Sequence, residues 1–226
     1  MVDNRTKTAS VIIVAAGEGK RFGSPKTLAL IKGCSVLIRS LQVFDSHPGV
    51  FEIILVLRDM EEQRGSLGQF SKVSKIVLGG RRRQDSVVSG FREIDPALAP
   101  IVLVHDAVRP LVTSDLIDRV IEAAAKNGAA VPVIPVCDTI KRIEDDKVSH
   151  TLERSGLFRC QTPQGFSYEV LKLALSRACM NEKNGTDEAS FVEAMGHKVW
   201  AVAGDPKNIK ITVPADLKIA EALFED

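Results

Sequence analysis

Three glycines and three basic residues share ten positions near the start of the chain. The stretch GEGKRFGSPK occupies residues 17–26 and follows the apolar run Val11–Ala15, so we expect a loop directly after a strand. Glycines let backbone N–H groups approach phosphate oxygens, and Lys20, Arg21 and Lys26 could neutralise their charge. The pattern favours a polyphosphate over a single carboxylate, although a surface turn with solvated charges would look the same.

Two common phosphate-binding templates do not match this loop. The P-loop pattern GxxxxGK[ST] does not occur in the sequence, which disfavours an ordinary P-loop NTPase. The dinucleotide pattern GxGxxG also fails, because three residues rather than two separate Gly19 from Gly23. Other segments must therefore decide what the loop binds.

Asp106 is a second candidate for chemistry, since it directly follows His105 and the apolar run Ile101–Val104. Ligands of α/β proteins usually bind at the carboxyl ends of strands, where a carboxylate can hold Mg²⁺ against phosphate oxygens. A cap of the following turn is the alternative role for Asp106. We expect the neighbouring His105 to be a packing residue without a chemical role.

The segment GGRRRQDS, residues 79–86, lies between an expected strand and an expected helix. Its glycines permit close backbone approach to a ligand, and Ser86 could donate a hydrogen bond to a base or sugar. Three consecutive arginines also occur in nucleic-acid-binding proteins. No aromatic residues are interleaved with them and no extended basic stripe is present, so we expect no nucleic-acid binding.

The elements that must position these residues follow an alternating pattern of strands and helices. This alternation predicts an α/β fold, Rossmann-like, with a mostly parallel sheet and helices on both faces. Residues 138–160 interrupt it, and we expect a projecting β-hairpin arm with a charged turn at Asp145-Asp146. The expected strands are Val11–Ala15, Phe51–Leu57, Ser74–Leu78, Ile101–Val104, Ala130–Val136 and Lys198–Val202.

Capping signals mark the helices between these strands. We expect helices to start after Ser35, Asp85 and Ser114 and at Pro214, and one to end at Gly128. No internal repeat or Pro/Ser-rich linker divides the chain, so we expect residues 1–226 to form a single domain.

Composition excludes several classes of protein. The 226 residues carry a formal net charge of +1, which gives no general attraction to nucleic acid or to an anionic membrane. The N-terminus lacks the apolar core of a signal peptide, and no apolar run could span a bilayer, so we expect a cytoplasmic protein without a membrane partner. The four cysteines have neither CxxC pairing nor metal-type spacing, and we expect buried, reduced thiols.

Seven short sequence segments contain most of the candidate residues. AAGEGKRFG, GGRRRQDSV, VHDAVRP, DTIKR, TPQ, TDEAS and NIKIT occur in this order over nearly the whole chain. Together with the Pro-Lys pair at residues 25–26, they resemble the motifs of the 2-C-methyl-D-erythritol 4-phosphate cytidylyltransferase family. One departure is Thr27, where glutamine often follows the lysine, and the span from Arg21 to Lys26 is shorter than in many relatives.

The resemblance implies a reaction in which a sugar-alcohol phosphate attacks the α-phosphate of CTP and releases pyrophosphate. It implies that Arg21 and Lys26 stabilise the transition state, that Mg²⁺ is the cofactor and that Asp106 binds it. It also implies a homodimer, in which the 138–160 hairpin reaches the second subunit. The implied nucleotide-binding residues are Ala15, Ala16, Gly17, Glu18, Gly19, Gly80, Arg81, Asp85 and Ser86. The implied substrate-binding residues are Asp106, Arg109, Thr139, Arg154, Thr162, Thr186, Asp187 and Lys210.

Other functions stay open at this point. A ribitol 5-phosphate cytidylyltransferase would share the fold and the CTP half of the site, and sugar 1-phosphate nucleotidyltransferases share mainly the opening loop. Arg109 could equally form an ordinary surface ion pair. A nucleotide-sensing module without catalytic activity is the alternative of another class, but it would not need cations placed for a transition state.

Overall fold

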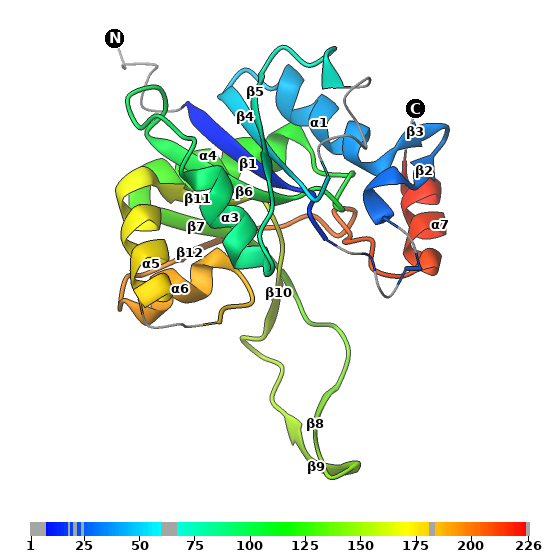
Figure 1. Cartoon of the computed structure of the whole chain (residues 1–226). Coiled ribbons are helices and arrows are strands. Elements are labelled where there is room, and N and C mark those ends of the chain that lie inside the picture. The colour runs from blue at the N-terminus through cyan, green and yellow to red at the C-terminus, as the bar shows by residue number, and fades with distance from the viewer. Residues whose placement is uncertain are drawn as a thin grey trace.

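The computed structural model describes residues 8–17, 19, 22–23, 25–59, 67–180 and 184–224. Within this part of the chain, eight strands form one sheet in the order β10-β7-β11-β6-β1-β4-β5, and β12 pairs with β7 (Figure 1). Of the strands in the described ranges, only β10 and β11 run antiparallel to their neighbours in this sheet, which confirms the mostly parallel sheet. The strands are β1 Ala9–Val14, β4 Val50–Leu57, β5 Val73–Leu78, β6 Ile101–Asp106, β7 Ala129–Pro135, β10 Phe158–Cys160, β11 Gln164–Ser167 and β12 Trp200–Ala203.

Helices cover both faces of this sheet, as expected. Side chains alternate along β1, so Val11 and Ile13 pack under α1 and α4, whereas Ile12 packs under α3, α5 and α6. All three side chains are completely buried, because β1 is central and pairs with both β4 and β6. The helices are α1 Val36–Ser46, α3 Arg83–Phe91, α4 Ser114–Asn127, α5 Tyr168–Met180, α6 Glu188–Ala194 and α7 Pro214–Leu223.

The helix ends partly match the expected caps. Ser35 caps α1 and accepts a hydrogen bond from the Ile38 N–H at 3.3 Å, and Gly128 ends α4 with φ +85°. The cap expected at Ser114 is wrong, because the preceding residue, Thr113, accepts from the Leu116 N–H at 3.3 Å. The start expected after Asp85 is also wrong, since α3 begins at Arg83 and Asp85 lies in its first turn.

A small cluster beside the sheet supports the end of the chain's basic loop. The 3-10 helix η2 (Lys26–Leu28) leads into a short antiparallel pair, β2 (Leu30–Ile31) and β3 (Cys34–Ser35). Ile31 packs there with Ile211 and Ala220 from the C-terminal part of the chain. Since α7 contacts β2, the last helix stabilises the segment that carries Lys26.

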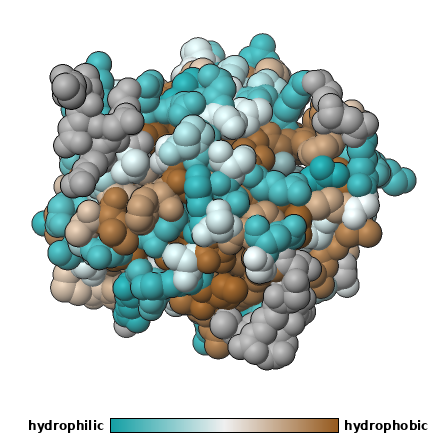
Figure 2. All heavy atoms as spheres, turned by 90° about the horizontal axis from the view of Figure 1, so that it is seen from above, coloured by the Kyte–Doolittle hydropathy of each residue, from teal (hydrophilic) through white to brown (hydrophobic). Residues whose placement is uncertain are grey.

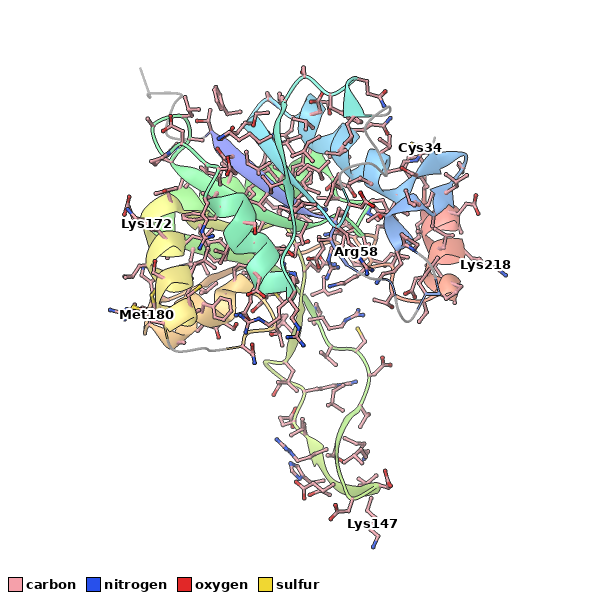
Figure 3. The ribbon with its side chains drawn as sticks, in the orientation of Figure 1. Cys34, Arg58, Lys147, Lys172, Met180 and Lys218 are labelled. Carbon is pink, nitrogen blue, oxygen red and sulfur yellow. The ribbon has the colours of Figure 1, made fainter. Side chains whose placement is uncertain are left out.

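A long β-hairpin arm extends away from the sheet (Figure 1). It is formed by β8 (Ile140–Glu144) and β9 (Lys147–Leu152), and its turn at Asp145 and Asp146 has φ +49° and +61°, as a tight hairpin requires. The side chain of Lys147 lies at the far tip (Figure 3). The expected range of 138–160 is too long, because Phe158–Cys160 is β10 and pairs with β7 in the central sheet.

Surface features bear on two further expectations, which concern a membrane-spanning helix and the state of the cysteines. Figure 2 shows hydrophilic residues across the face seen from above, with hydrophobic residues between them. Within the described ranges, no helix combines the length and the apolar character needed to cross a bilayer. All four cysteines are free, but the expectation that they are buried is wrong for Cys137, Cys160 and Cys179, which are exposed.

Candidate functional site

A cavity of about 240 Å³ opens at the carboxyl ends of β1 and β6. Four segments that are far apart in the sequence form its walls: the basic loop, the 79–86 segment, the end of β6 and the stretch before α7. This is the edge where parallel sheets usually bind ligands. The lining residues are Val14, Ala15, Ala16, Gly17, Lys26, Thr27, Gly80, Arg81, Arg82, Arg83, Ser86, Asp106, Val108 and Lys210.

Nine of the residues expected to bind substrate or act on it lie on this wall. They come from separate motifs, and the fold therefore brings the basic loop, the arginine segment and Asp106 together as expected. These residues are Ala15, Ala16, Gly17, Lys26, Gly80, Arg81, Ser86, Asp106 and Lys210. Gly19 lies in the described part of the loop but not on the wall, whereas Glu18 and Arg21 lie outside the described residues.

Close backbone contact explains the glycine pair of the arginine segment. A Cβ atom on Gly79 would lie 2.3 Å from the Ala16 Cβ, and a Cβ atom on Gly80 would lie 2.3 Å from the Asp85 Cβ. Such distances are far below van der Waals contact. Glycine at position 79 therefore lets the arginine segment approach the basic loop, and glycine at position 80 lets the segment pack against the first turn of α3. The Ser86 hydroxyl accepts from the Gly80 N–H at 3.1 Å and donates to the Arg82 carbonyl at 3.3 Å, so these two partners lie within its own loop.

Asp106 lies between two cations. Its Oδ1 accepts from the Arg83 Nε at 2.9 Å and its Oδ2 accepts from the Lys210 Nζ at 2.7 Å, while the residue is only 6% exposed. Burial alone would raise the pKa of this carboxyl, but the charges of Arg83 and Lys210 outweigh it and hold the pKa far below its usual range. Asp106 is therefore ionised at every physiological pH.

Arg83 has a second carboxylate partner that the motif analysis did not single out. Its Nη1 donates to both oxygens of Glu188, at 2.8 and 2.9 Å, and Glu188 is completely buried. The two carboxylates raise the pKa of Arg83 against the effect of its own burial. Glu188 stands in the TDEAS string, so its sequence position was noted without a role; its burial beside an arginine appears only in the fold.

Lys26 reaches the cavity from the first position of η2. On the neighbouring segment, Asp216 accepts from the Thr212 N–H at 2.7 Å, its hydroxyl at 2.5 Å and the Val213 N–H at 3.0 Å. These hydrogen bonds, with a contribution from the charge of Lys26, lower the pKa of Asp216 although its partial burial opposes the shift. The start of α7 thus presents an ionised carboxylate on the side of Lys26.

Three of the expected residues form hydrogen bonds within the protein, and two of them, Thr162 and Arg109, are buried. Thr162 is 5% exposed; its Oγ1 accepts from the Asp106 N–H at 3.1 Å and lies 3.2 Å from the His105 Nδ1. Arg109 is 9% exposed and donates to the carbonyls of Asn208 at 2.9 Å and Cys160 at 3.4 Å, so a surface ion pair is excluded for it. Asp187 caps α6 by accepting from the Ser190 N–H at 3.1 Å.

His105 is a packing residue, as expected. The ring is fully buried and tilted against Phe44, with the centroids 4.8 Å apart. Its Nε2 lies 3.3 Å from the Arg109 carbonyl and must donate to it, so the neutral ring accepts from the Thr162 hydroxyl at Nδ1. Burial lowers the pKa of His105 to about 3. His105 also does not line the cavity, which agrees with a packing role.

Three further expected residues are exposed and lie away from the cavity wall. Thr139 and Arg154 stand where the arm leaves the sheet, and the Arg154 guanidinium donates to the Cys137 carbonyl. Thr186 lies in the loop before α6. Within one copy of the chain, the described structure does not bring these three residues onto the wall formed by Lys26 and Asp106.

A smaller cavity of about 190 Å³ continues from the first. It shares Ala15, Gly17 and Thr27 with the larger cavity and adds Arg58 and Asp59 from the end of β4. Figure 3 places Arg58 near the centre of the molecule, between the strand ends and the region of α7. The site therefore extends from the basic loop towards Arg58 and Asp59.

Comparison with known proteins agrees with this geometry. The family model for 2-C-methyl-D-erythritol 4-phosphate cytidylyltransferase matches residues 9–226. The chain belongs to this family. A cytidylyltransferase of this name from Bacillus velezensis is 45% identical over 222 residues, which cover 95% of each chain. Another, from Symbiobacterium thermophilum, is 42% identical over 220 residues and covers 96% of this chain and 93% of its own.

Solved structures of the family share the fold as well. The crystal structure of 2-C-methyl-D-erythritol 4-phosphate cytidylyltransferase from Thermus thermophilus superposes with a TM-score of 0.81 at 35% identity, covering 96% of this chain and 98% of its own. The structure of the 4-diphosphocytidyl-2C-methyl-D-erythritol synthase from Anaerococcus prevotii gives a TM-score of 0.85 at 31% identity and covers 96% of both chains. The α/β fold is thus that of the cytidylyltransferase family.

The charges on the wall suit the polyphosphate of a cytidylyltransferase. Among the residues that the structure describes, five basic residues and one acidic residue line this wall: Lys26, Arg81, Arg82, Arg83 and Lys210 with Asp106. In the same residues, no cluster of three or more His, Cys, Asp or Glu side chains could hold a metal ion by itself. Any divalent cation here would need most of its ligands from the substrate and from water.

Proposed function

We propose that this chain transfers CMP from CTP to 2-C-methyl-D-erythritol 4-phosphate, giving 4-diphosphocytidyl-2-C-methyl-D-erythritol and pyrophosphate. Membership of the family supports this reaction, since the relatives at 42–45% identity carry its name. The reaction belongs to the non-mevalonate synthesis of isoprenoid precursors. The same relatives favour methylerythritol phosphate over ribitol 5-phosphate as the acceptor.

The single observation that carries the proposal is the excess of cations around one carboxylate at the strand ends. In this reaction a phosphate oxygen of the acceptor attacks the α-phosphorus of CTP while the bond to the β-phosphate breaks. Negative charge grows on the departing pyrophosphate, so the protein must supply placed cations and an in-line arrangement rather than covalent chemistry. Lys26, on the cavity wall, would neutralise this charge together with Arg21.

The nucleotide would lie along the basic loop and the arginine segment. Ala16 and Gly17 would offer backbone N–H groups to the phosphates, beside Ala15, whose own N–H donates to the Val56 carbonyl at 2.8 Å. Gly80, Arg81 and Ser86 would line the cytidine side. Gly19 and Asp85 would stabilise the two loops, since the Gly19 carbonyl accepts from the Phe22 N–H and the Asp85 carboxylate accepts from the Arg82 N–H. Glu18 completes the proposed set from the sequence. Close contact between the two loops at Gly79 supports this assignment, because it leaves their backbones lining one cavity.

Lys210 would hold the acceptor phosphate on the other side of Asp106. Its ammonium is 2.7 Å from the Asp106 carboxylate and its side chain is 39% exposed, so it is oriented and yet accessible from the cavity. A dianionic phosphate needs more than one cation, and Arg154 from the arm is the second candidate. Thr139, Thr162, Thr186, Asp187 and Arg109 would shape this acceptor side around them.

Mg²⁺ is the proposed cofactor, and Asp106 is the residue that would hold it. A lone carboxylate fits this role, because Mg²⁺ at nucleotides takes one or two carboxylates and completes its shell with phosphate oxygens and water. When bound, the ion would screen the repulsion between the phosphates and the attacking oxygen. Lys210 would have to release the Asp106 Oδ2, which makes its ammonium available to the acceptor phosphate.

A homodimer would complete the acceptor side. Thr139 and Arg154 are exposed at the base of the arm and away from the cavity of their own copy, which supports a role in the cavity of a partner. On the arm itself, Ile143 and Val148 are paired across the two strands and are 55% and 60% exposed. Apolar pairs of this kind are what a second copy would bury.

We also propose that residues 1–226 act as one nucleotidyltransferase domain in the cytoplasm. One sheet runs from β1 near the start of the described chain to β12 near its end, which supports a single unit. The four free cysteines suit a reducing compartment.

An assay with two acceptors tests the proposed function. Purified protein receives CTP and Mg²⁺ with either methylerythritol phosphate or ribitol 5-phosphate, and pyrophosphate release is recorded. We expect turnover with methylerythritol phosphate and at most slow turnover with ribitol 5-phosphate. Turnover with ribitol 5-phosphate alone would reassign the acceptor, and binding of CTP without turnover of either acceptor would favour a nucleotide-sensing module.

A further inference from the structure

Glu188 is a buried carboxylate that does not line the cavity. A single residue, Arg83, connects it to Asp106, the carboxylate on the cavity wall. The Glu188 side chain is completely buried, at the first position of α6. Both of its oxygens accept hydrogen bonds from the same nitrogen of Arg83, at 2.8 and 2.9 Å. Burial raises the pKa of Glu188, so its charge depends on this arginine.

Arg83 carries the contact onward to the cavity. While its Nη1 binds Glu188, its Nε donates to the Asp106 Oδ1 at 2.9 Å, and Asp106 binds Lys210 through its other oxygen. The guanidinium is planar and rigid, so an anchor on one edge fixes the direction in which the other edge points. An ordered series of charges therefore runs from Glu188 through Arg83 and Asp106 to Lys210.

Neighbouring contacts tie the same two segments together. On either side of Arg83, the Arg82 Nη1 donates to the Asn184 Oδ1 at 2.6 Å, and the Gln84 Oε1 accepts from the Gly185 N–H at 3.3 Å. Three consecutive residues at the start of α3 thus bind the stretch 184–188. This contact joins the loop proposed for the nucleotide to the loop that carries Thr186 and Asp187, proposed for the acceptor.

We propose that Glu188 is a positioning residue for cytidylyl transfer, acting through Arg83 to fix the direction in which the Asp106 carboxylate faces the cavity. This inference rests on the proposed function. A buried ion pair is weak evidence for stability, because apolar residues of the same volume often stabilise a core as well or better. The proposed contribution of Glu188 is to orient Arg83. Without the charge of Glu188, Arg83 keeps only one of its two carboxylate partners, and the guanidinium that binds Asp106 is no longer held in a fixed orientation.

The test compares Glu188→Gln with Glu193→Gln, which removes the same charge from an exposed position of the same helix. Steady-state rates are measured with CTP, methylerythritol phosphate and Mg²⁺. We expect Glu188→Gln to lower kcat by about 10- to 100-fold, the scale of a misplaced catalytic group, with KM for CTP changed by less than about threefold. Glu193→Gln should stay within about twofold of wild type.

A double-mutant cycle separates positioning from a merely structural role. Arg83→Lys keeps the charge but cannot bind two carboxylates with one rigid fork. If Glu188 acts through Arg83, adding Glu188→Gln to Arg83→Lys lowers kcat by less than about twofold more, because coupled residues are not additive. Losses that multiply, or a Glu188→Gln variant that behaves like Glu193→Gln, would overturn the proposal.

Folding and function are checked separately. Circular dichroism shows whether each variant is folded at the assay temperature, and Glu188→Asp replaces Glu188→Gln in the cycle if the latter is unfolded. If both variants are unfolded, Glu188 is a structural residue and the proposal is wrong. Wild-type protein without turnover would instead refute the proposed function, so the two failures are distinguishable.

Discussion

The ammonium of Lys210 lies 2.7 Å from the carboxylate of Asp106, although the two residues are 104 positions apart in the chain. Asp106 ends the central strand β6, whereas Lys210 follows the last strand and precedes α7. The carboxylate is shared with Arg83, so the cavity contains a negative group that is already balanced by two cations. A phosphate that enters would therefore compete with Asp106 for Lys210, and a metal ion would compete with Lys210 for Asp106.

Replacement of Lys210 tests this arrangement. We expect Lys210→Gln to lower kcat by about 100-fold, the usual loss when a reacting group is misplaced, with a smaller change in KM for CTP. KM for the acceptor phosphate should rise, because its proposed cation is lost. Lys207→Gln is the control, since Lys207 is exposed on the same segment and outside the larger cavity. Equal kinetics for the two variants would refute the role of Lys210.

Replacement of Gly79 tests the contact between the two nucleotide loops. A Cβ atom at this position would lie 2.3 Å from the Ala16 Cβ and 2.8 Å from the Ser86 Oγ. We expect Gly79→Ala to lower the free energy of unfolding by about 1–3 kcal/mol and to weaken CTP binding in titration calorimetry, because the loops must move apart. Gly68→Ala is the control, since no atom of the described residues, apart from its two chain neighbours, lies within 4 Å of that Cβ. Unchanged CTP affinity for Gly79→Ala would contradict this account of the loop.

The long parallel strands of the sheet were easier to predict from the sequence than its short antiparallel strands. Central strands such as β1 and β6 are continuous apolar runs, so their positions were evident from composition alone. The short strands β10 and β11 were missed, because each has only three or four residues and β11 is defined by its antiparallel neighbours rather than by its own pattern. Helix α6 was missed for a similar reason, since seven residues give little periodicity.

The candidate site was predicted where a motif adjoins a strand end. Lys26, Gly80 and Asp106 follow this rule and line one cavity. Arg83 could not be singled out from its two neighbouring arginines, because only the fold shows which one points at two carboxylates. The burial of Arg109 was equally hidden, since its partners are backbone carbonyls that the folded chain supplies from residues far along the sequence.

Acid should destabilise the protein through His105. Its pKa is near 3 in the folded state and 6.5 in the unfolded chain, so the unfolded state binds more protons between these values. The contribution is present above pH 6.5 and is lost as the pH falls towards 3. We expect His105 to account for about 2–3 kcal/mol of the stability lost between pH 7.5 and 4.5.

Urea unfolding at these two pH values measures this contribution. The loss of stability on acidification should be smaller by that amount in His105→Gln than in wild type. His197→Gln, a change at an exposed histidine, should show the same loss as wild type. A His105→Gln variant with the full acid sensitivity would show that the ring does not resist protonation in the fold.

The exposed apolar pair on the arm tests the proposed homodimer. We expect wild-type protein to sediment as a dimer. In the double variant Ile143→Ser, Val148→Ser, the dissociation constant of the dimer should rise by about tenfold or more, because each of these apolar side chains is more than half exposed in one copy. Activity should fall with the dimer fraction, because Arg154 is proposed to act in the partner's cavity. Lys147→Ser at the tip is the control, and a fully active monomer of wild-type protein would exclude the shared site.

Phosphorus NMR of the reaction mixture tests the central claim most directly. Protein, CTP, Mg²⁺ and methylerythritol phosphate are combined, and the phosphorus species are followed with and without the acceptor. The account predicts that pyrophosphate and a new diphosphate diester form in equal amounts, and that neither forms without the acceptor. Orthophosphate from CTP, pyrophosphate without the diester, or unchanged CTP in the complete mixture would contradict it.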